Sequence, residues 1–297
     1  MSYCLQPDEP VASGIRRIAR EELAGALCQI SQVTDGKEVA AVHATRKHIK
    51  KIRALLRLVR QEIGEEIFEE EDQRARDVAR AFSGSRDARV QLQLLEKLRR
   101  QAHQESAAFS KTSSALEKEM AAHTDRFGPR RREARTTLQE ICDRLEGWPL
   151  DDLGMDDLCC ALQRSYRRGR KGLRCAGTES TTENFHSLRK RVKEVWYQTR
   201  ILRCLNPAVM RETADAAKTL GQELGDLHDL ALFRNRLAAE EGCRDDERSV
   251  LLGLICTRET ELEQIALDLG ARFFAEKPLA FERRLLRYGR EWPRRSA

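Results

Sequence analysis

The sequence predicts an all-α protein, and three observations carry this prediction. Leu, Ala, Arg and Glu dominate the 297 residues, aromatic residues reach only 5%, and no stretch alternates Val, Ile and Thr as a β-strand would. The dominant residues favour helices, whereas β-branched and aromatic residues are enriched in sheets. Hydrophobic residues make up 40% and charged residues 34%, without a long uncharged apolar run. We therefore expect a soluble, folded chain with no transmembrane segment.

Apolar periodicity and helix-breaking residues divide the chain into expected helices. In the first half they cover residues 12–33, 37–63, 66–82, 86–103, 105–125 and 129–146. In the second half they cover residues 152–176, 183–205, 207–223, 227–242, 245–276 and 278–291. Short links between long amphipathic helices favour antiparallel neighbours, so each half should form a helical bundle. The segment GWPLDDLGMDD at residues 147–157 is the expected boundary between them.

The two halves carry a repeated basic segment. Residues 43–60 read HATRKHIKKIRALLRLVR and residues 186–203 read HSLRKRVKEVWYQTRILR; at a shift of 143, six of the 18 positions are identical, and all six are basic. A weaker repeat pairs FSGSRDARV at residues 82–90 with LGDLHDLAL at residues 224–232. Each reads as a glycine-containing break before an Asp that caps a new helix. Two matching segments in the same order predict an internal duplication with halves at residues 12–148 and 149–292.

The repeated segment places its basic residues on one side of a helix. At 100° per residue, five of them fall in an arc about 100° wide. These sets, called the first and second basic rows below, are His43, Arg46, Lys47, Lys50 and Arg57, and His186, Arg189, Lys190, Lys193 and Arg200. The opposite, core-facing side of the first segment carries Ile49, Ile52, Leu55, Leu56 and Val59.

A basic row can be an ordinary solvated helix face. The arc contains no Asp or Glu, however, and like charges three and four residues apart repel one another. Because the row occurs twice with its histidine in register, an anion site is favoured. Arg offers bidentate donors to phosphate, Lys a compact charge and His a pH-dependent donor, so ten such groups suit a long polyanion. A further basic face on the opening helix of the second half carries Arg164, Arg167, Arg168 and Lys171.

With these motifs, the sequence resembles the CHAD family, named for its histidines and α-helices. The resemblance rests on two H-x-x-R-K-x-x-K segments, on SYRRGRKGL at residues 165–173 and on the two break segments, and it spans roughly residues 12–292. It implies two four-helix-like bundles related by a pseudo-twofold axis, with a basic channel or cavity between them. It also implies binding of inorganic polyphosphate and association with polyphosphate granules.

The resemblance assigns both basic rows as polyanion ligands, with Arg168 and Lys171 as additions. Free phosphate or sulfate ions are expected to fit the same site. Two positions depart from the repeat: Arg53 corresponds to Trp196, and Arg86 corresponds to His228. The two rows are therefore expected to be unequal at these points.

Three other functions compete with polyanion binding. An enzyme would need carboxylates to hold Mg²⁺, and the nearest cluster, Glu223, Asp226, His228 and Asp229, reads more simply as helix caps. The acidic run at residues 62–72 reads as a solvated helix face, and no Gly-rich phosphate loop occurs. A histidine metal site is disfavoured because His43 and His48 lie about 140° apart on a helix. We expect no enzyme activity, cofactor or metal, although a metal-dependent phosphohydrolase stays an alternative.

Nucleic acid is the strongest rival ligand, because its backbone is also a polyphosphate. Binders of single strands usually add aromatic stacking platforms, and only Trp196 and Tyr197 accompany the basic rows. Nucleic-acid backbone binding is therefore the less favoured reading, and no membrane partner is expected.

The nine cysteines form no C-x-x-C pair, and several lie within apolar stripes. Such thiols behave as small hydrophobic side chains, so reduced cysteines and neither a disulfide framework nor a zinc site are expected. The opening MSYCLQPDEPVASG lacks a basic segment followed by an apolar one, which argues against secretion. We expect a cytoplasmic protein, located at polyphosphate granules.

Overall fold

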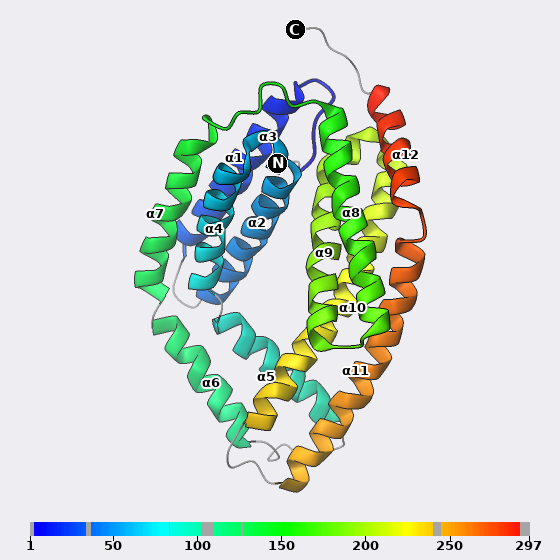
Figure 1. Ribbon diagram of the computed structural model, residues 1–297. Coiled ribbons are helices and arrows are strands. Elements are labelled where there is room, and N and C mark those ends of the chain that lie inside the picture. Colours follow the sequence, from blue (N-terminus) through cyan, green and yellow to red (C-terminus); the bar gives the residue numbers. More distant parts are fainter. Residues whose placement is uncertain are drawn as a thin grey trace.

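The computed structural model describes residues 3–33, 37–82, 84–101, 110–125, 127–239 and 245–291 (Figure 1). Every regular element in these ranges is a helix, which confirms the all-α prediction. In the part assigned to the first half, the helices are α1 (Val11–Ser31), α2 (Glu38–Leu58), α3 (Arg60–Ile63), α4 (Glu65–Ala81), α5 (Gly84–Gln101), α6 (Ser110–Asp125) and α7 (Phe127–Leu145). The remainder forms α8 (Met155–Thr178), α9 (Thr182–Ile201), the 3₁₀ helix η1 (Leu202–Leu205), α10 (Pro207–Ala239), α11 (Asp245–Phe273) and α12 (Pro278–Arg290).

Two groups of helices pack side by side (Figure 1). In the first, α1 packs on α2 and α7, and α4 also packs on α2 and α7. In the second, α8, α9, α10 and α11 pack in the same cyclic order, with α12 on the outer side of α8. The hairpin of α5 and α6 extends from the first group, and α5 contacts α10 and α11 of the second. The two groups of helices are therefore in contact through α5.

The helix that carries the first basic row has the predicted core face. Ile49, Ile52, Leu55, Leu56 and Val59 are at most 1% exposed. Each such side chain stabilises the fold by about 1.5–3 kcal/mol on burial. The remaining surface of α2 is left for the charged side chains.

Several predicted boundaries need correction. The expected helix over residues 37–63 ends at Leu58, and Gly64, whose φ is 80°, turns the chain into α4. A residue with a side chain would be strained at this φ, which explains the glycine. The expected break at residues 223–227 is wrong, because α10 continues unbroken from Pro207 to Ala239. Asp229 therefore lies inside a helix and caps nothing.

Local sequence sets other helix ends. The Thr181 side chain accepts a hydrogen bond from the Asn184 N–H (3.2 Å) and caps α9. The Asp157 carboxylate accepts one from the Gly154 N–H (2.9 Å) at the start of α8. The predicted boundary segment at residues 147–157 forms the connection from α7 into α8, and its Trp148 is buried.

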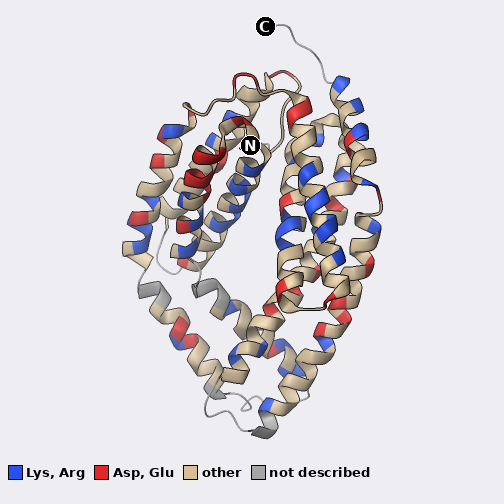
Figure 2. Cartoon of the chain, viewed as in Figure 1, with Lys and Arg blue, Asp and Glu red and all other residues tan. Residues whose placement is uncertain are grey.

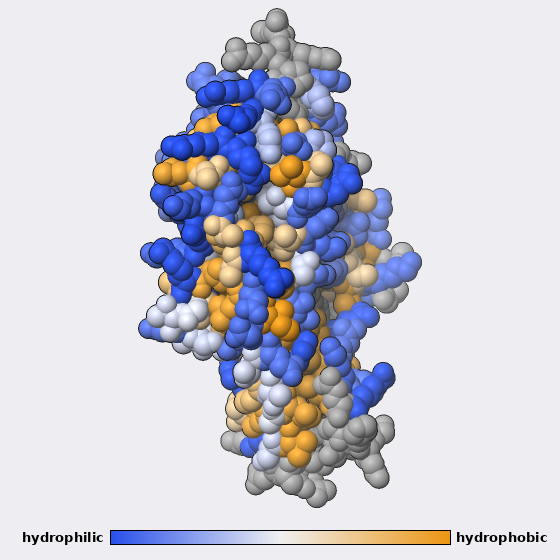
Figure 3. All heavy atoms as spheres, turned by 90° about the vertical axis from the view of Figure 1, so that its right-hand side faces the viewer, coloured by the Kyte–Doolittle hydropathy of each residue, from blue (hydrophilic) through white to orange (hydrophobic). Residues whose placement is uncertain are grey.

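The outer face of α11 and α12 shows apolar patches scattered among hydrophilic side chains (Figure 3). The exposed large apolar residues of the described chain include Leu279 on α12, which is 64% exposed. No helix in the described ranges combines the length and apolar character needed to cross a bilayer.

Candidate anion-binding site

The first basic row divides into exposed and anchored side chains. His43, Lys47 and Lys50 are exposed on α2. Arg46 is half-buried and donates a hydrogen bond to the Ala79 carbonyl near the end of α4 (2.8 Å). A cation at a helix C-terminus complements the helix dipole, so Arg46 also stabilises α4.

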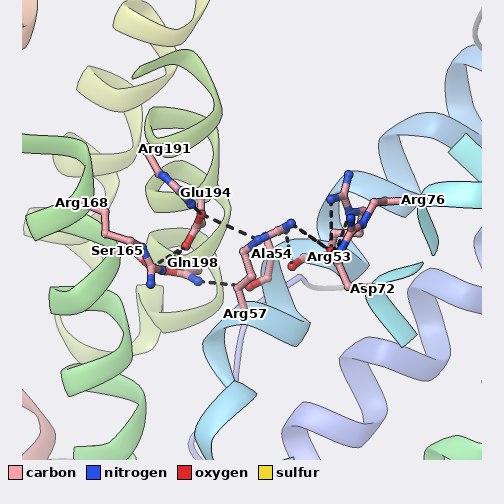
Figure 4. Close-up of polar contacts among 10 residues, drawn as sticks. All are labelled: Arg53, Ala54, Arg57, Asp72, Arg76, Ser165, Arg168, Arg191, Glu194 and Gln198. Carbon is pink, nitrogen blue, oxygen red and sulfur yellow. Dashed lines mark hydrogen bonds and ion pairs between the residues drawn. The ribbon is translucent and has the colours of Figure 1, made fainter. Parts of the chain in front are cut away.

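Arg57, the last member of the first row, lies at a buried carboxylate (Figure 4). Asp72 of α4 is 2% exposed and accepts hydrogen bonds from Arg53 (2.8 Å) and Arg57 (3.2 Å). Arg76, one turn further along α4, pairs with the other carboxylate oxygen (2.8 Å). Burial alone would raise the pKa of Asp72, but the three arginines outweigh it and lower the pKa, so the group is ionised.

A second buried carboxylate continues this cluster into α8 and α9. Glu194 of α9 pairs with Arg168 of α8 (2.6 Å) and with Arg191 (3.2 Å), and it accepts a hydrogen bond from the Ser165 hydroxyl (2.8 Å). Arg57 projects from α2 toward the same carboxylate, with 3.9 Å between Nε and Oε2.

The two carboxylates orient more positive charge than they neutralise. Five arginines, all with partly exposed side chains, surround Asp72 and Glu194, namely Arg53, Arg57, Arg76, Arg168 and Arg191. Each guanidinium group carries five N–H donors and stays charged at any physiological pH. The cluster therefore retains a positive excess and unused donors.

A pocket of about 500 Å³ opens beside this cluster, between the two helix groups. Arg57, Arg60 and Gly64 line it from the first group, and Arg164 and Arg168 line it from α8. Arg60 is paired with Glu65. Arg164 makes no hydrogen bond or ion pair with the described residues, although its charge lies close enough to Glu62 and Cys160 to offset part of the rise in pKa that burial causes in each.

Three residues of the second basic row, His186, Arg189 and Lys193, lie against α10. The two helices run antiparallel, which brings His186 against His228, with 4.4 Å between the stacked ring centroids. Gly225 lies opposite Arg189, and a Cβ atom there would be 3.8 Å from the Arg189 Nε. The Arg189 side chain is half-buried as a result.

One turn earlier on α10, Gly221 lies under Lys193. A Cβ atom at Gly221 would come within 3.1 Å of the Lys193 Cε and 3.2 Å of its Nζ. The segment that the sequence suggested as a helix break is thus a continuous helix, and its two glycines give room for two side chains of the second row. The pKa of His186 is lowered, because the ring is partly buried and lies near Lys190 and Arg189.

The far end of the second row is bound to aromatic rings. The Arg200 guanidinium group lies 5.2 Å from the centre of the Trp196 ring and 5.3 Å from that of Tyr3. Lys193 Nζ lies 4.9 Å from the centre of the same Trp196 ring. These cation–π contacts fix both side chains. Lys190 of the second row and Lys171 of α8 are exposed.

The C-terminal parts of α2 and α9 are in contact. Gln198 of α9 donates to the Ala54 carbonyl of α2 (3.2 Å), and Arg57 approaches Glu194. Figure 2 shows Lys and Arg gathered along α2, α8 and α9 in the middle of the molecule, and Asp and Glu gathered on α4.

Two readings of acidic residues need correction. The run at residues 62–72 is only partly a solvated face, because Glu71 and Asp72 are 2% exposed and bind arginines. Glu223, Asp226, His228 and Asp229 lie within α10, so they do not cap helices. No group of three or more His, Cys, Asp and Glu side chains in the described ranges is arranged to hold a metal ion. The side chains of Arg86 and Asp87 lie outside the described residues.

Sequence reasoning missed Asp72, Glu194, Arg76, Arg191 and Arg60 as parts of the site. Asp72 stands in an acidic run and Glu194 follows the lysines of the second row, so neither has a local signal of burial. A lone carboxylate within a basic helix, as at Glu194, is the one feature that could have suggested an anchoring role.

Comparison with known protein families identifies the class. The model of the CHAD domain matches residues 17–238. The chain therefore belongs to the CHAD-domain family, as its motifs suggested. The match includes both basic rows, Asp72 and Glu194, whereas α11 and α12 lie beyond it. A search of curated proteins finds no match to this chain.

Proposed function

We propose that this protein binds inorganic polyphosphate along the basic surface formed by α2, α8 and α9. The observation that carries the proposal is the cluster of five arginines oriented by only two buried carboxylates, next to an arginine-lined pocket. Membership of the CHAD family supports the choice of ligand. Binding, without turnover of the chain, is the proposed activity.

The geometry suits a long chain of phosphates better than one phosphate ion. A polyphosphate presents charge at every unit, so it can contact the oriented arginines and the exposed Lys47, Lys50, Lys171 and Lys190 together. Hydrogen bonds between charged groups contribute about 1.5–3 kcal/mol each before desolvation costs. Several together give tight binding that weakens with salt. A phosphate or sulfate ion would occupy only the pocket.

We infer that the two basic helices come from an internal duplication and line a shared channel. The repeated sequence and the similar packing of α2 on α1 and of α9 on α8 support the duplication. The contact between the C-terminal parts of α2 and α9 supports a shared track. Localisation in the cytoplasm at polyphosphate granules is part of the same proposal.

The experiment must distinguish polyphosphate from nucleic acid as the ligand. Trp196 is the aromatic residue of the second basic segment that could stack on a base. Its ring already makes cation–π contacts with Lys193 and Arg200 and packs against Tyr197. Purified protein should be titrated with long-chain polyphosphate at several salt concentrations, with single-stranded DNA as competitor. Equal or tighter binding of the DNA would contradict the proposed ligand.

Matched charge reversals test the site. Lys47 and Lys190 occupy the same position in the two rows, and both are exposed. Lys47→Glu and Lys190→Glu should each weaken polyphosphate binding by about tenfold, equivalent to about 1.4 kcal/mol. Arg135→Glu, on the exposed face of α7, is the control and should leave the affinity unchanged. Loss of affinity in the control alone, or in none of the three, would show that the site is elsewhere.

Turnover is tested separately. The protein is incubated with polyphosphate and Mg²⁺, and released phosphate is measured over time. We expect none above the background of the buffer. Sustained release that Asp229→Asn abolishes would replace the binding proposal with the phosphohydrolase alternative.

A further inference from the structure

A second pocket lies between α9, α10 and α11 and shares no lining residue with the arginine-lined pocket. Its volume is about 250 Å³, and its lining includes the start of α9, part of α10 and two carboxylates of α11, Glu259 and Glu263. Pockets for drug-sized ligands span about 300–1,000 Å³, so this one suits a smaller ligand. Both carboxylates lie beyond the residues that match the CHAD model.

Glu259 is a buried carboxylate with a partner on only one of its oxygen atoms. Its side chain is 7% exposed, and Oε2 pairs with Arg234 of α10 at 3.0 Å. Oε1 is buried and makes no hydrogen bond within the described part of the chain. Burial of an acceptor without a donor is unfavourable, so Oε1 is a place for a donor that comes from a ligand.

The pocket holds more negative than positive charge. Glu263 lies one turn after Glu259 on α11, and its carboxylate accepts a hydrogen bond from the Ser180 hydroxyl (2.6 Å). Burial raises the pKa of Glu259, and the charge of Glu263 adds to the rise, against the attraction of Arg234. Among the described residues that line the pocket, Arg234 is the one Lys or Arg. One permanent cation therefore faces two carboxylates.

The positive groups beside the pocket are already compensated by the protein. Besides pairing with Glu259, Arg234 donates to the Thr182 hydroxyl (3.2 Å). The positive end of the α9 dipole is met by Thr181, which caps the helix, and by Glu183 in the first turn. An anion in the pocket would lie beside two carboxylates, whereas a cation would be attracted by them.

Apolar side chains and a histidine complete the lining. Phe185, Leu224 and Leu227 are at most 5% exposed and form apolar walls. The lowered pKa of His186 leaves its ring neutral at neutral pH, and its buried Nδ1 makes no hydrogen bond with the described residues. A neutral imidazole has one nitrogen that can accept a hydrogen bond. An inorganic cation would leave the apolar walls without contacts, whereas an organic cation can cover them.

We propose that this pocket binds a small primary ammonium ion, namely an amine with a short hydrocarbon chain. Its –NH₃⁺ group has three donors, which match the acceptors on Glu259, Glu263 and His186. Its hydrocarbon chain covers the apolar walls at Phe185 and Leu224. This inference does not depend on polyphosphate binding.

The test measures the binding of n-butylamine to the full-length protein by isothermal titration calorimetry at neutral pH and without polyphosphate. At this pH the amine is protonated, as a lysine side chain is. We expect saturable binding with a Kd of about 1 mM. Uncharged n-butanol and anionic butanoate have chains of the same length, and each should bind at least about tenfold more weakly.

Variants of α11 test the assigned carboxylates. Glu259→Gln keeps the shape of the side chain and removes its charge, so it should weaken n-butylamine binding by about tenfold. Glu263→Gln should weaken it severalfold. Glu261→Gln is the matched control, because Glu261 lies between the two on α11, is 53% exposed, pairs with Arg258 and does not line the pocket. This control should bind n-butylamine like the parent.

Three results would overturn the proposal. One is the absence of saturable n-butylamine binding to the parent protein. Another is n-butanol or butanoate binding as tightly as the amine, which would exclude recognition of the positive charge. The third is an unchanged affinity for n-butylamine in both Glu259→Gln and Glu263→Gln. The comparison of the three probes uses the parent protein, so it decides the matter even where a variant folds poorly.

Discussion

The two basic rows have the same residue spacing and different surroundings. On α2, three of the five side chains are exposed, and the two arginines are anchored by the Ala79 carbonyl and by Asp72 of α4. On α9, four of the five are half-buried against α10 or aromatic rings, and only Lys190 is exposed. An identical pattern in sequence therefore gives one row with three exposed side chains and one row with a single exposed side chain.

The difference originates in the neighbouring helix. Next to α2 lies α4, whose buried carboxylates attract arginines. Next to α9 lies α10. Gly221 and Gly225 of α10 have no side chain, so they leave room for the long side chains of Lys193 and Arg189. A fixed cation loses less conformational freedom on binding an anion, so the second row is the more preorganised of the two.

The largest expected effect concerns the anchoring carboxylate of the first row. Asp72→Asn leaves Arg53, Arg57 and Arg76 around a neutral group and should lower the free energy of unfolding by about 3 kcal/mol, measured by urea denaturation. Glu70→Gln, two residues away on α4 and with a 53% exposed side chain, is the control. Its loss should be below about 1 kcal/mol. Equal losses in the two variants would mean that the buried cluster does not stabilise the fold.

The pH dependence of Asp72 has a definite sign. Its pKa is lower in the folded protein than in the unfolded chain, so the unfolded state binds more protons in acid. The stabilisation by this group is complete above the ordinary Asp pKa and disappears as the pH falls through the folded-state pKa. Acid denaturation of Asp72→Asn should therefore be shallower than that of the parent, and identical acid profiles would contradict this.

The next effect tests whether polyphosphate binding requires the space that Gly221 of α10 leaves for Lys193 of the second row. Gly221→Leu fills the space of the Lys193 side chain and should weaken polyphosphate binding by about tenfold, or about 1.4 kcal/mol. Circular dichroism checks that the helix content is unchanged. Lys193→Ala should give a similar loss, and adding Gly221→Leu to it should weaken binding little further. Additive losses would show that Gly221 acts independently of Lys193.

Protonation of His186, the histidine of the second row, should have a smaller effect on polyphosphate affinity. Because the pKa of His186 is lowered, the ring is neutral at neutral pH and becomes charged in mild acid. Its protonation opposes folding of the unbound protein, which loses stability as the pH falls through the ordinary His range. The same protonation favours the polyanion, so affinity should rise severalfold between about pH 7 and pH 5.

The ring lies near Arg189 and Lys190 on its own helix and stacks on His228 of α10. His186→Gln should reduce the rise in affinity with acid, while Lys190→Gln, which keeps the histidine, should retain it. A rise of the same size in His186→Gln would exclude His186 as its source.

The smallest effect concerns the other glycine of α10. A Cβ atom at Gly225 meets Arg189 at 3.8 Å, an ordinary contact, and the residue does not have a positive φ. Gly225→Ala should therefore raise stability by about 0.5 kcal/mol through helix propensity and leave binding unchanged. A destabilised variant would mean that Arg189 requires a bare backbone at this position.

The sequence by itself determined the all-α class, the core face of α2, the two basic rows and the family, because these depend on composition and on local periodicity. Only the tertiary structure decided that α10 is continuous and that Asp72 and Glu194 are buried among arginines. A glycine predicts a break unless a neighbouring side chain occupies the space it leaves. The environment of a buried carboxylate is set by residues far away in the chain, and packing alone brings them together.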